Sequence, residues 1–281
     1  MQARIYRPGI DKGWGLSVWV EMITELLKTR ELIWRMFLRD FTAKYKQTVL
    51  GILWAIIMPL VTVATFLFLH RSGILNIGNV SIPYPAYAIL GLTIWHIFGG
   101  GIVSCTNSIV DKGGMLVKIN LPREAFVIIS FLQIIVEFFV RLCLVILMFI
   151  IYKIVPSWTV IFLPFVLLPL VLFTLGLGLF FSILNVLMRD IGKLVTIVAT
   201  FLLFLTPVLY SSPKGGIFST ITKFNPVSTL ISAARDIILT GRITEPNEFI
   251  FVSILSLFIF ILCWRIFHFA EMRVMESIGL R

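Results

Sequence analysis

The sequence predicts an all-α polytopic membrane protein with six transmembrane helices and both termini in the cytoplasm. Of its 281 residues, 59% are hydrophobic and only 14% are charged, too few charges to cover a soluble globule with polar groups. The apolar residues gather in runs of about 20, enough for a helix to cross a hydrocarbon core about 30 Å thick. The basic residues lie between these runs and not on a solvated, aromatic-interleaved face, so the formal charge of +10 does not indicate a nucleic-acid partner.

The first 48 residues are expected to form a cytoplasmic arm and an amphipathic helix in the membrane interface. Residues 1–16 are polar and lack the apolar region of a cleavable signal peptide, so the first true span should direct insertion. Over residues 17–47, apolar positions step by four along one helical face, namely Ile33, Phe37, Phe41 and Tyr45. Basic residues share the opposite face, namely Arg35, Arg39 and Lys46. This pattern indicates an interface helix, and a simple positive-inside anchor is the alternative.

The transmembrane domain is expected over residues 49–267, followed by a cytoplasmic tail over 268–281. Its six apolar runs cover residues 49–69, 87–110, 125–151, 160–184, 194–210 and 249–267. The fifth run is short and ends at Thr206-Pro207, which indicates a bent or incomplete crossing. An even number of spans places both termini on one side, and the concentration of Lys and Arg there makes that side cytoplasmic. The predicted outer loops hold few basic residues, which are Arg71, Lys153, Lys214, Lys223, Arg235 and Arg242.

The outer segment over residues 211–248 is too polar to cross a membrane and too apolar to be only a loop. Asn225-Pro226 is a helix-start signal. Apolar residues follow it at helical spacing, which are Val227, Leu230, Ile231, Ala234, Ile237 and Ile238. We expect one or two short re-entrant helices here, packed on protein or lining a cavity. A helix lying flat on the outer surface is the alternative.

The chain carries no sequence motif for catalysis. It contains no G-x-x-x-x-G-K-[ST], and Gly176-Leu177-Gly178 lies in an apolar run without the strand, turn and helix of a phosphate loop. The histidines are scattered and the cysteines are far apart in apolar stretches: His70, His96, His268, Cys105, Cys143 and Cys263. We therefore expect no catalytic residue, no metal and no cofactor on this chain.

One pair of charges lies in the middle of the third run. Glu137 and Arg141 are four residues apart, so they share a helical face and can neutralise each other. Charges at this depth are costly in lipid, and they either carry function in the bundle interior or fix helix packing. Some aromatic residues near predicted boundaries, such as Trp95, Trp158 and Tyr210, suit an interfacial belt, and a minority of the aromatics could pack on sugar rings.

The connection after the second run, residues 111–124, is a short amphipathic insert with glycines at its start and a proline near its end. A plain loop would not need so many apolar residues in water, so we favour a short helix pressed against a soluble partner. The residues expected to dock are Lys112, Gly113, Met115, Leu116, Val117, Lys118, Asn120, Leu121 and Pro122, with Arg189 and Asp190 after the fourth run.

Short motifs along nearly the whole chain resemble, in order, the permease subunits of type-2 ABC exporters that move polysaccharides such as O-antigen, capsule and teichoic acid. The most specific stretch is Arg39-Asp40, Lys44-Tyr45-Lys46-Gln47-Thr48-Val49-Leu50-Gly51, Trp54 and Pro59. Supporting stretches are Lys118-Ile119-Asn120-Leu121-Pro122, Met188-Arg189-Asp190, Thr206-Pro207-Val208-Leu209-Tyr210 and Asn225-Pro226.

The resemblance implies a homodimer in the bacterial cytoplasmic membrane, whose two copies form a continuous channel for a lipid-linked polysaccharide. Two copies of a separate cytoplasmic ATPase would bind ATP and Mg and press on a coupling helix over residues 112–122. O-antigen is favoured, because residues 7–14 and the long helix after them look most like that branch. Path or gate candidates are Trp54, Pro59, Trp95, Pro207, Tyr210, Asn225 and Pro226. Leu116→Asp should then uncouple export without preventing membrane insertion.

Two other functions are compatible with this architecture. A membrane-embedded transferase acting on a lipid-linked sugar would need clustered Asp, Glu or His at a membrane boundary, which the sequence lacks outside Glu137 and Arg141. A permease for teichoic acid, capsule, a small lipid or a drug would share the same spans. A transporter subunit should copurify with a nucleotide-binding protein, whereas an enzyme would turn over substrate without one.

Overall fold

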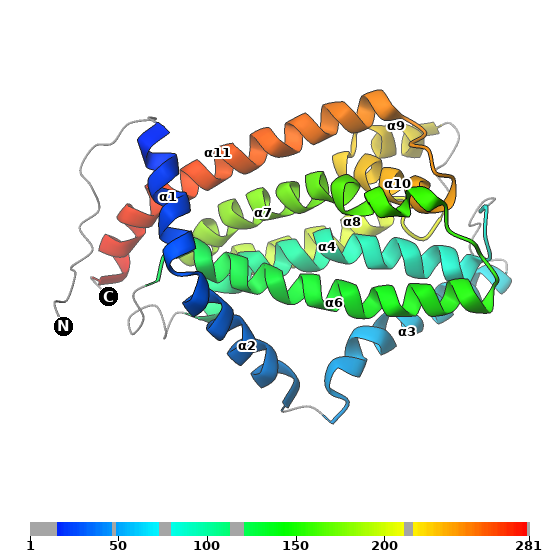
Figure 1. The fold of residues 1–281 in the computed structure, drawn as a ribbon, viewed down its shortest axis with the longest axis horizontal. Helices are drawn as coiled ribbons and strands as arrows, with labels where there is room; N and C mark the ends of the chain where they lie inside the picture. The colour runs from blue at the N-terminus through cyan, green and yellow to red at the C-terminus, as the bar shows by residue number, and fades with distance from the viewer. Residues whose placement is uncertain (1–15, 47–48, 73–79, 113–120, 211–215, 280–281) are drawn as a thin grey trace.

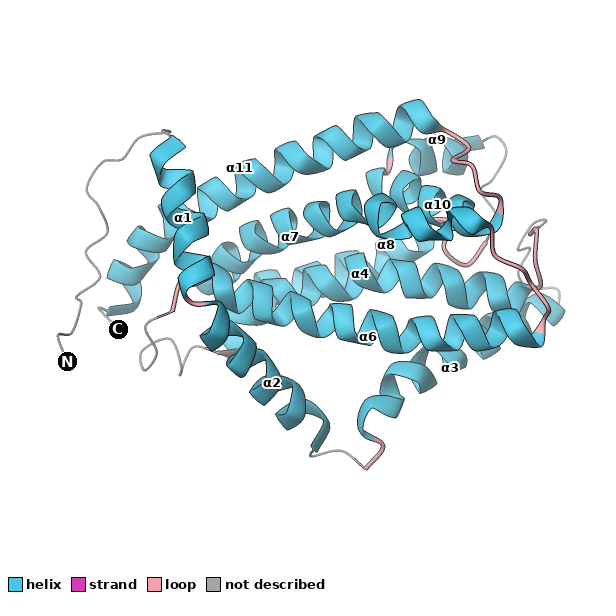
Figure 2. Cartoon of the chain, in the orientation of Figure 1, coloured by secondary structure: helices cyan, strands magenta, loops and turns pink. Residues whose placement is uncertain are grey.

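The computed structural model describes residues 16–46, 49–72, 80–112, 121–210 and 216–279, and all regular structure in these ranges is helical (Figure 2). The helices, in chain order, are α1 (Leu16–Lys28), α2 (Arg30–Lys46), η1 (Gly51–Leu53), α3 (Trp54–Arg71), α4 (Tyr84–Asp111), α6 (Glu124–Ile151), η2 (Trp158–Phe162), α7 (Leu163–Leu187), α8 (Asp190–Leu205), α9 (Gly216–Phe224), α10 (Pro226–Leu239) and α11 (Pro246–Gly279). The predicted all-α class is confirmed.

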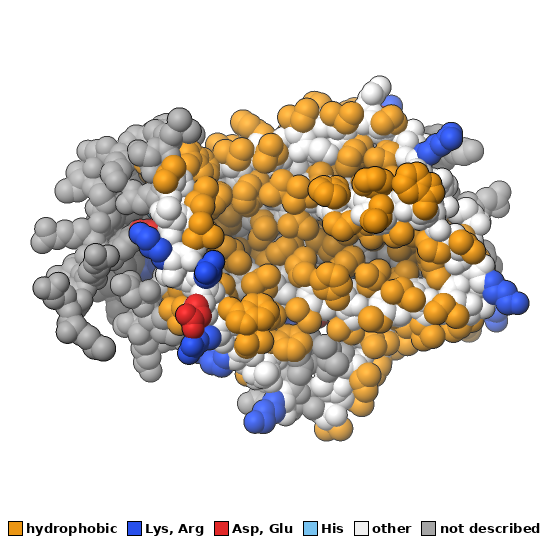
Figure 3. Space-filling view, viewed as in Figure 1, with side chains coloured by type: hydrophobic (Ala, Val, Ile, Leu, Met, Phe, Trp, Pro, Cys, Tyr) orange, Lys and Arg blue, Asp and Glu red, His pale blue; other side chains and the backbone are white. Residues whose placement is uncertain are grey.

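The long helix α4 forms the centre of the bundle. In its most apolar window, 78% of residues are buried inside the molecule, against 33% in α6, 39% in η2 with α7 and 22% in α11. Most residues in the apolar windows of the outer helices are therefore at least partly exposed, and Figure 3 shows hydrophobic side chains over the middle of one face. A wide apolar exterior around a packed core is what lipid requires.

Four helical segments are long and apolar enough to cross a membrane: α4, α6, η2 with α7, and residues Pro246–Ala270 of α11. They correspond to the second, third, fourth and sixth predicted spans. In place of the other two, the structure has a shorter apolar stretch over Trp54–Leu69 of α3 and the 16-residue α8. At about 1.5 Å per residue α8 reaches about 24 Å, less than a full hydrocarbon core. The shortness of the fifth segment is thus confirmed, and the six-span count stays a prediction.

The N-terminal helical stretch is two helices and not the single one expected. The chain changes direction at Thr29, where neither glycine nor proline marks a break, and its hydroxyl donates to the Glu25 carbonyl at 2.8 Å (Figure 1). α1 packs edge-on through Trp19 against Trp264 of α11. α2 packs on the start of α6 through a cluster of buried residues, which are Ile33, Met36, Phe37, Leu121, Ala125, Phe126 and Ile129. The predicted apolar stripe therefore docks α2 on protein.

The segment after α8 contains two short helices, as its pattern predicted. Asn225 caps α10, because its side chain accepts a hydrogen bond from the Val227 N–H at 3.0 Å, and Pro226 occupies the first helical position. α10 is buried on most of its surface and packs on α4, α7, η2 and α11. Whether this segment re-enters a bilayer stays a prediction. The predicted tail after residue 267 continues as helix, since α11 ends only at Gly279.

Candidate functional site

The bundle has two distinct ends, which organise its polar side chains. The α1 end holds α1, the C-terminal part of α11, the last turn of α4, the first turn of α6 and the turn between α7 and α8 (Figure 1). The α10 end holds α9, α10, η2 and the first turn of α4. The described flanks of the connection after the second run, residues 111–112 and 121–124, and the turn after the fourth run all lie at the α1 end.

The docking residues fall into two groups there. Arg189 and Asp190 are exposed in the turn between α7 and α8. Lys112 and Leu121 point into the chain's own packing instead, because the Lys112 side chain is only 12% exposed and Leu121 belongs to the cluster beneath α2. Pro122 is half-buried. Gly113, Met115, Leu116, Val117, Lys118 and Asn120 lie outside the described residues, so their docking role stays a prediction.

An amide cluster joins the helix ends next to these two connections. Asn185, 1% exposed near the end of α7, donates to the Thr106 carbonyl and to the Asn107 side-chain oxygen, both at 3.1 Å. Its own oxygen accepts the backbone N–H of Gly192 at 2.8 Å. A methyl group on Gly192 would overlap the side-chain oxygen of Asn107, so a larger residue there would displace the Asn107 amide from this cluster. The first turn of α8 is therefore fastened to the last turns of α4, the helix that leads into Lys112.

Two ion pairs fasten α2 to the bundle. Asp40 and Lys44 lie one helical turn apart on α2 and carry opposite charges. Asp40 pairs with Lys112 after the end of α4, at 3.1 Å, and Lys44 pairs with Glu137 in the middle of α6, at 2.6 Å. Burial lowers the pKa of Lys112, an effect that its hydrogen bond to Asp40 opposes. The alternation of charge fixes which turn of α2 lies against which helix.

Glu137 has partners on two other helices. One carboxylate oxygen accepts from Lys44, and the other lies 2.9 Å from His96 Nε2 of α4. Glu137 thus joins α2, α4 and α6 at mid-bundle. Arg141 is half-buried one turn further along α6, and the predicted pairing between Glu137 and Arg141 stays a prediction. Of the other interface-helix residues, Arg35 pairs with Glu31 at 2.6 Å, Arg39 contacts Asp40, and Lys46 is exposed. The side chain of Tyr45 lies outside the described residues.

A buried arginine organises the α10 end. Arg235 of α10 is 6% exposed and donates to the Tyr87 hydroxyl, to the Pro207 carbonyl at 3.0 Å and to the Val208 carbonyl at 2.9 Å. Its guanidinium lies 4.0 Å from the centroid of the Tyr87 ring. Tyr87 donates in turn to the Tyr210 carbonyl at 3.1 Å. Pro207 and Val208 follow the end of α8, so Arg235 satisfies backbone carbonyls that no helix uses.

The path and gate candidates divide between this cluster and the rest of the bundle. Pro207 and Tyr210 contact the Arg235 network directly, and Asn225 joins the same segment by donating to the Thr206 hydroxyl at 2.9 Å. Pro226 follows Asn225 in the first turn of α10. Trp95 is buried in the core beside Phe98, whereas Trp54 is exposed and Pro59 is buried on α3. The structure therefore gathers the candidates after α8 and leaves the others apart.

Sequence reasoning missed the buried polar residues that hold these sites together. Arg235 was counted only as an outer-loop charge, although a cation inside an apolar helical pattern was a usable signal. The sequence offered no such signal for Asn185, His96 or Tyr87, because the role of each depends on a partner far away in the chain. The described residues contain no group of three or more His, Cys, Asp or Glu that could hold a metal ion.

Long apolar helices around a buried core, with polar clusters at both ends, define a multi-pass membrane protein. Residues 31–239 match the ABC-2 type transporter family, and the chain belongs to that family. It is 26% identical over 210 residues to an O-antigen export system permease protein RfbA of Klebsiella pneumoniae, covering 73% of this chain and 79% of that relative. A second Klebsiella protein of that name is 27% identical over 229 residues, covering 80% and 85%. The Myxococcus xanthus protein of that name is 25% identical over 266 residues, covering 92% and 100%.

Proposed function

We propose that this chain is the permease subunit of an ATP-driven exporter that moves a lipid-linked polysaccharide across the bacterial cytoplasmic membrane. The polysaccharide we favour is an O-antigen. Membership of the ABC-2 transporter family and the shared name of three relatives from two genera carry this proposal. In it the chain crosses the membrane six times, with both termini in the cytoplasm, and two copies form the channel.

The mechanism proposed for coupling rests on the α1 end. A permease without a phosphate loop needs work from another polypeptide, so a partner ATPase that binds ATP and Mg would press on the connections after α4 and after α7. In this proposal the Asn185 cluster would make the helix ends next to these connections move together, because it joins Gly192 of α8 to Thr106 and Asn107 of α4. Both connections lead into helices that reach the α10 end, so a displacement at one end of the bundle would reach the other.

At the α10 end the proposed role is that of an outer gate. α10 and the segment after α8 are joined by Arg235, and neither is a transmembrane helix in length. Short elements packed across the end of a bundle can shift without unfolding a span, since only their packing and a few hydrogen bonds resist the shift. Opening would separate α10 from α4 and from the chain after α8.

A deletion strain distinguishes this proposal from the transferase alternative. Loss of an exporter leaves finished lipid-linked polymer on the inner face of the cytoplasmic membrane, whereas loss of a transferase leaves the polymer unmade or incomplete. We expect full-length polymer to accumulate in spheroplasts, protected from an added glycosidase until the membrane is permeabilised. Incomplete polymer would refute the export proposal in favour of an enzyme, and finished polymer that the glycosidase reaches in intact spheroplasts would refute a role in export.

A further inference from the structure

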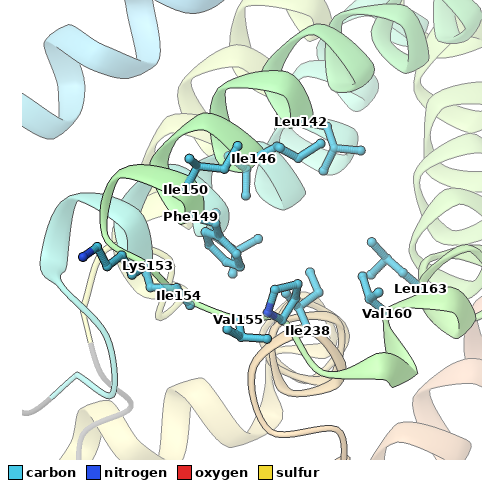
Figure 4. A pocket seen from close by; sticks show the side chains of 13 residues that line it. Leu142, Ile146, Phe149, Ile150, Lys153, Ile154, Val155, Val160, Leu163 and Ile238 are labelled. Atoms are coloured by element: carbon cyan, nitrogen blue, oxygen red, sulfur yellow. The ribbon is translucent and has the colours of Figure 1, made fainter.

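An apolar groove opens on the outside of the bundle near the α10 end. It has a volume of about 360 Å³ and lies between α6 on one side and η2 with the start of α7 on the other (Figure 4). The groove exists because α6 and α7 each pack along α4 but contact one another much less. Its floor consists of side chains from the central elements, Leu90 of α4 and Ile238 of α10, which are 1% and 4% exposed.

The walls of the groove are apolar and fixed. Ile150, Ile146 and Leu142 line it at intervals of four residues along α6, so it extends over about two helical turns. The opposite wall is fastened to α10, since the Ser157 N–H donates to the Ile238 carbonyl at 2.9 Å and Thr159 donates to the Ile237 carbonyl at 2.8 Å. A preformed apolar cavity of this size lies at the lower end of the range for ligand sites, about 300–1,000 Å³.

A single cation stands among the lining residues, at the mouth of the groove. Lys153 follows the end of α6, and Figure 4 shows its nitrogen directed away from the apolar lining. It adopts the left-handed conformation, with φ 54°, and its N–H bonds to the Ile150 carbonyl while the Ile154 N–H bonds to the Phe149 carbonyl. Glycine is the usual residue at this position of a helix end, so a lysine there bears a backbone cost.

The residues around the mouth mark the depth of the membrane interface. Tyr152 and Trp158 flank Lys153 in the chain and are 40% and 78% exposed. Amphipathic aromatic rings collect at the level of lipid headgroups, and a lysine near a helix end extends its ammonium into the same layer. The groove therefore has a cationic end at headgroup level and an apolar end that extends along α6 toward mid-membrane.

We propose that this groove binds an anionic membrane phospholipid, with an acyl chain along Ile150, Ile146 and Leu142 and the phosphate beside Lys153. Its polarity and direction match those of a lipid lying parallel to the helices, and the cation complements an anionic headgroup. The site is separate from the polar clusters at both ends and does not depend on the exported substrate. The bound lipid would fill the gap between α6 and α7 at the level where α10 packs.

The test uses the full chain with its partner ATPase in phosphatidylcholine vesicles that contain a minor fraction of phosphatidylglycerol carrying a photoreactive acyl chain. Labelled peptides are identified by mass spectrometry. We expect labelling of residues 142–163 to exceed severalfold that of the α11 face formed by Ile250, Ile254 and Leu257, which is also apolar and exposed but does not line this groove. Equal labelling of both faces would overturn the proposal.

Four variants separate the contribution of the groove from that of the charge. Lys153→Gln should lower labelling about fivefold, the factor expected for one cation beside an anionic headgroup, and Lys153→Arg should restore it. Ile146→Trp should lower labelling by filling the groove, in protein that remains monodisperse. Arg242→Gln removes an exposed cation that does not line the groove and should change nothing. Unchanged labelling in Lys153→Gln would contradict the assignment of the headgroup.

Two further outcomes would assign the groove to a different molecule. If photoreactive polyprenyl phosphate labels the groove in competition with excess phosphatidylglycerol, the site belongs to a substrate carrier. If Ile146→Cys forms a disulfide between two copies of the chain in the membrane, the groove is a subunit interface. Either result would overturn the assignment to a membrane phospholipid.

Discussion

The replacement Asn185→Leu removes a buried amide that makes three hydrogen bonds, to the Thr106 carbonyl, the Asn107 side chain and the Gly192 N–H. A typical hydrogen bond contributes about 0.5–1.5 kcal/mol net, so the loss should destabilise the chain by roughly 2–4 kcal/mol. Leu is similar in size and no new cavity is expected. The effect should therefore come from lost hydrogen bonds between α8 and α4 rather than from packing.

The functional consequence follows from where this cluster lies. Its hydrogen bonds link the first turn of α8 to the last turns of α4. Their loss should therefore let the connections after α4 and after α7 move independently. We expect the variant to insert and to bind its ATPase, while polymer exported per ATP hydrolysed falls about five- to 150-fold, the span of ordinary coupling free energies. Export is measured in proteoliposomes, with ATP hydrolysis recorded in the same sample.

The matched control lies on the same helix. Thr200 is exposed on α8 and donates only to the Thr196 carbonyl within its own helix, so Thr200→Ala should alter neither quantity. Export and thermal inactivation of Asn185→Leu that match those of Thr200→Ala would show that the amide cluster does not couple the two connections.

Three further outcomes are expected. Arg235→Met should lower the free energy of unfolding by at least about 3 kcal/mol, because three acceptors lose a charged donor. The control Arg242→Met, on the exposed surface, should lower it by less than about 0.5 kcal/mol. Equal losses of stability in thermal denaturation would refute the buried network. A double-mutant cycle with Lys44→Met and Glu137→Gln should give a coupling of about 1 kcal/mol, since the Lys44 side chain is 48% exposed, and zero coupling would mean that α2 is not held there. Gly91→Ala should cost about 1–3 kcal/mol, because the added methyl group overlaps the Val208 carbonyl, and an unchanged midpoint of denaturation would contradict that close approach.

The long helices could be predicted from the sequence because each is one uninterrupted apolar run. The run over 87–110 lies within α4, which the structure begins at Tyr84 and ends at Asp111. The start of α10 was also readable, since Asn225 and Pro226 act within their own turn. Local patterns of this kind carry their own physical cause, and distant residues do not alter them.

The break at Thr29 and the shortness of α3 were harder to predict, whereas the run that forms α8 was already short in the sequence. Thr29 is neither glycine nor proline, so the change of direction there depends on where α1 and α2 pack, against α11 and α6. α8 starts at Asp190, and the chain stops being helical at Thr206, whose backbone is extended. A run of apolar residues shows the composition of a segment but does not show how many of its residues form a helix.

The polar clusters could not be predicted because their members are far apart in the chain. Glu137 lies 93 residues from Lys44, and Arg235 lies 148 residues from Tyr87. The sequence rule for neighbours on one helix could offer only Arg141 as a partner for Glu137. Burial of Lys112 and Leu121 was likewise hidden, since both depend on the docking of α2.

Reconstitution with purified components tests most directly whether this chain exports a polymer with energy from a second polypeptide. Vesicles that contain the chain, a candidate partner ATPase and lipid-linked polymer are supplied with ATP on the ATPase side, and polymer on the far side is measured with an impermeant lectin. We expect signal only when the chain, the ATPase and ATP are all present. Far-side polymer in vesicles without the ATPase, or ATP hydrolysis by the chain alone, would contradict the account.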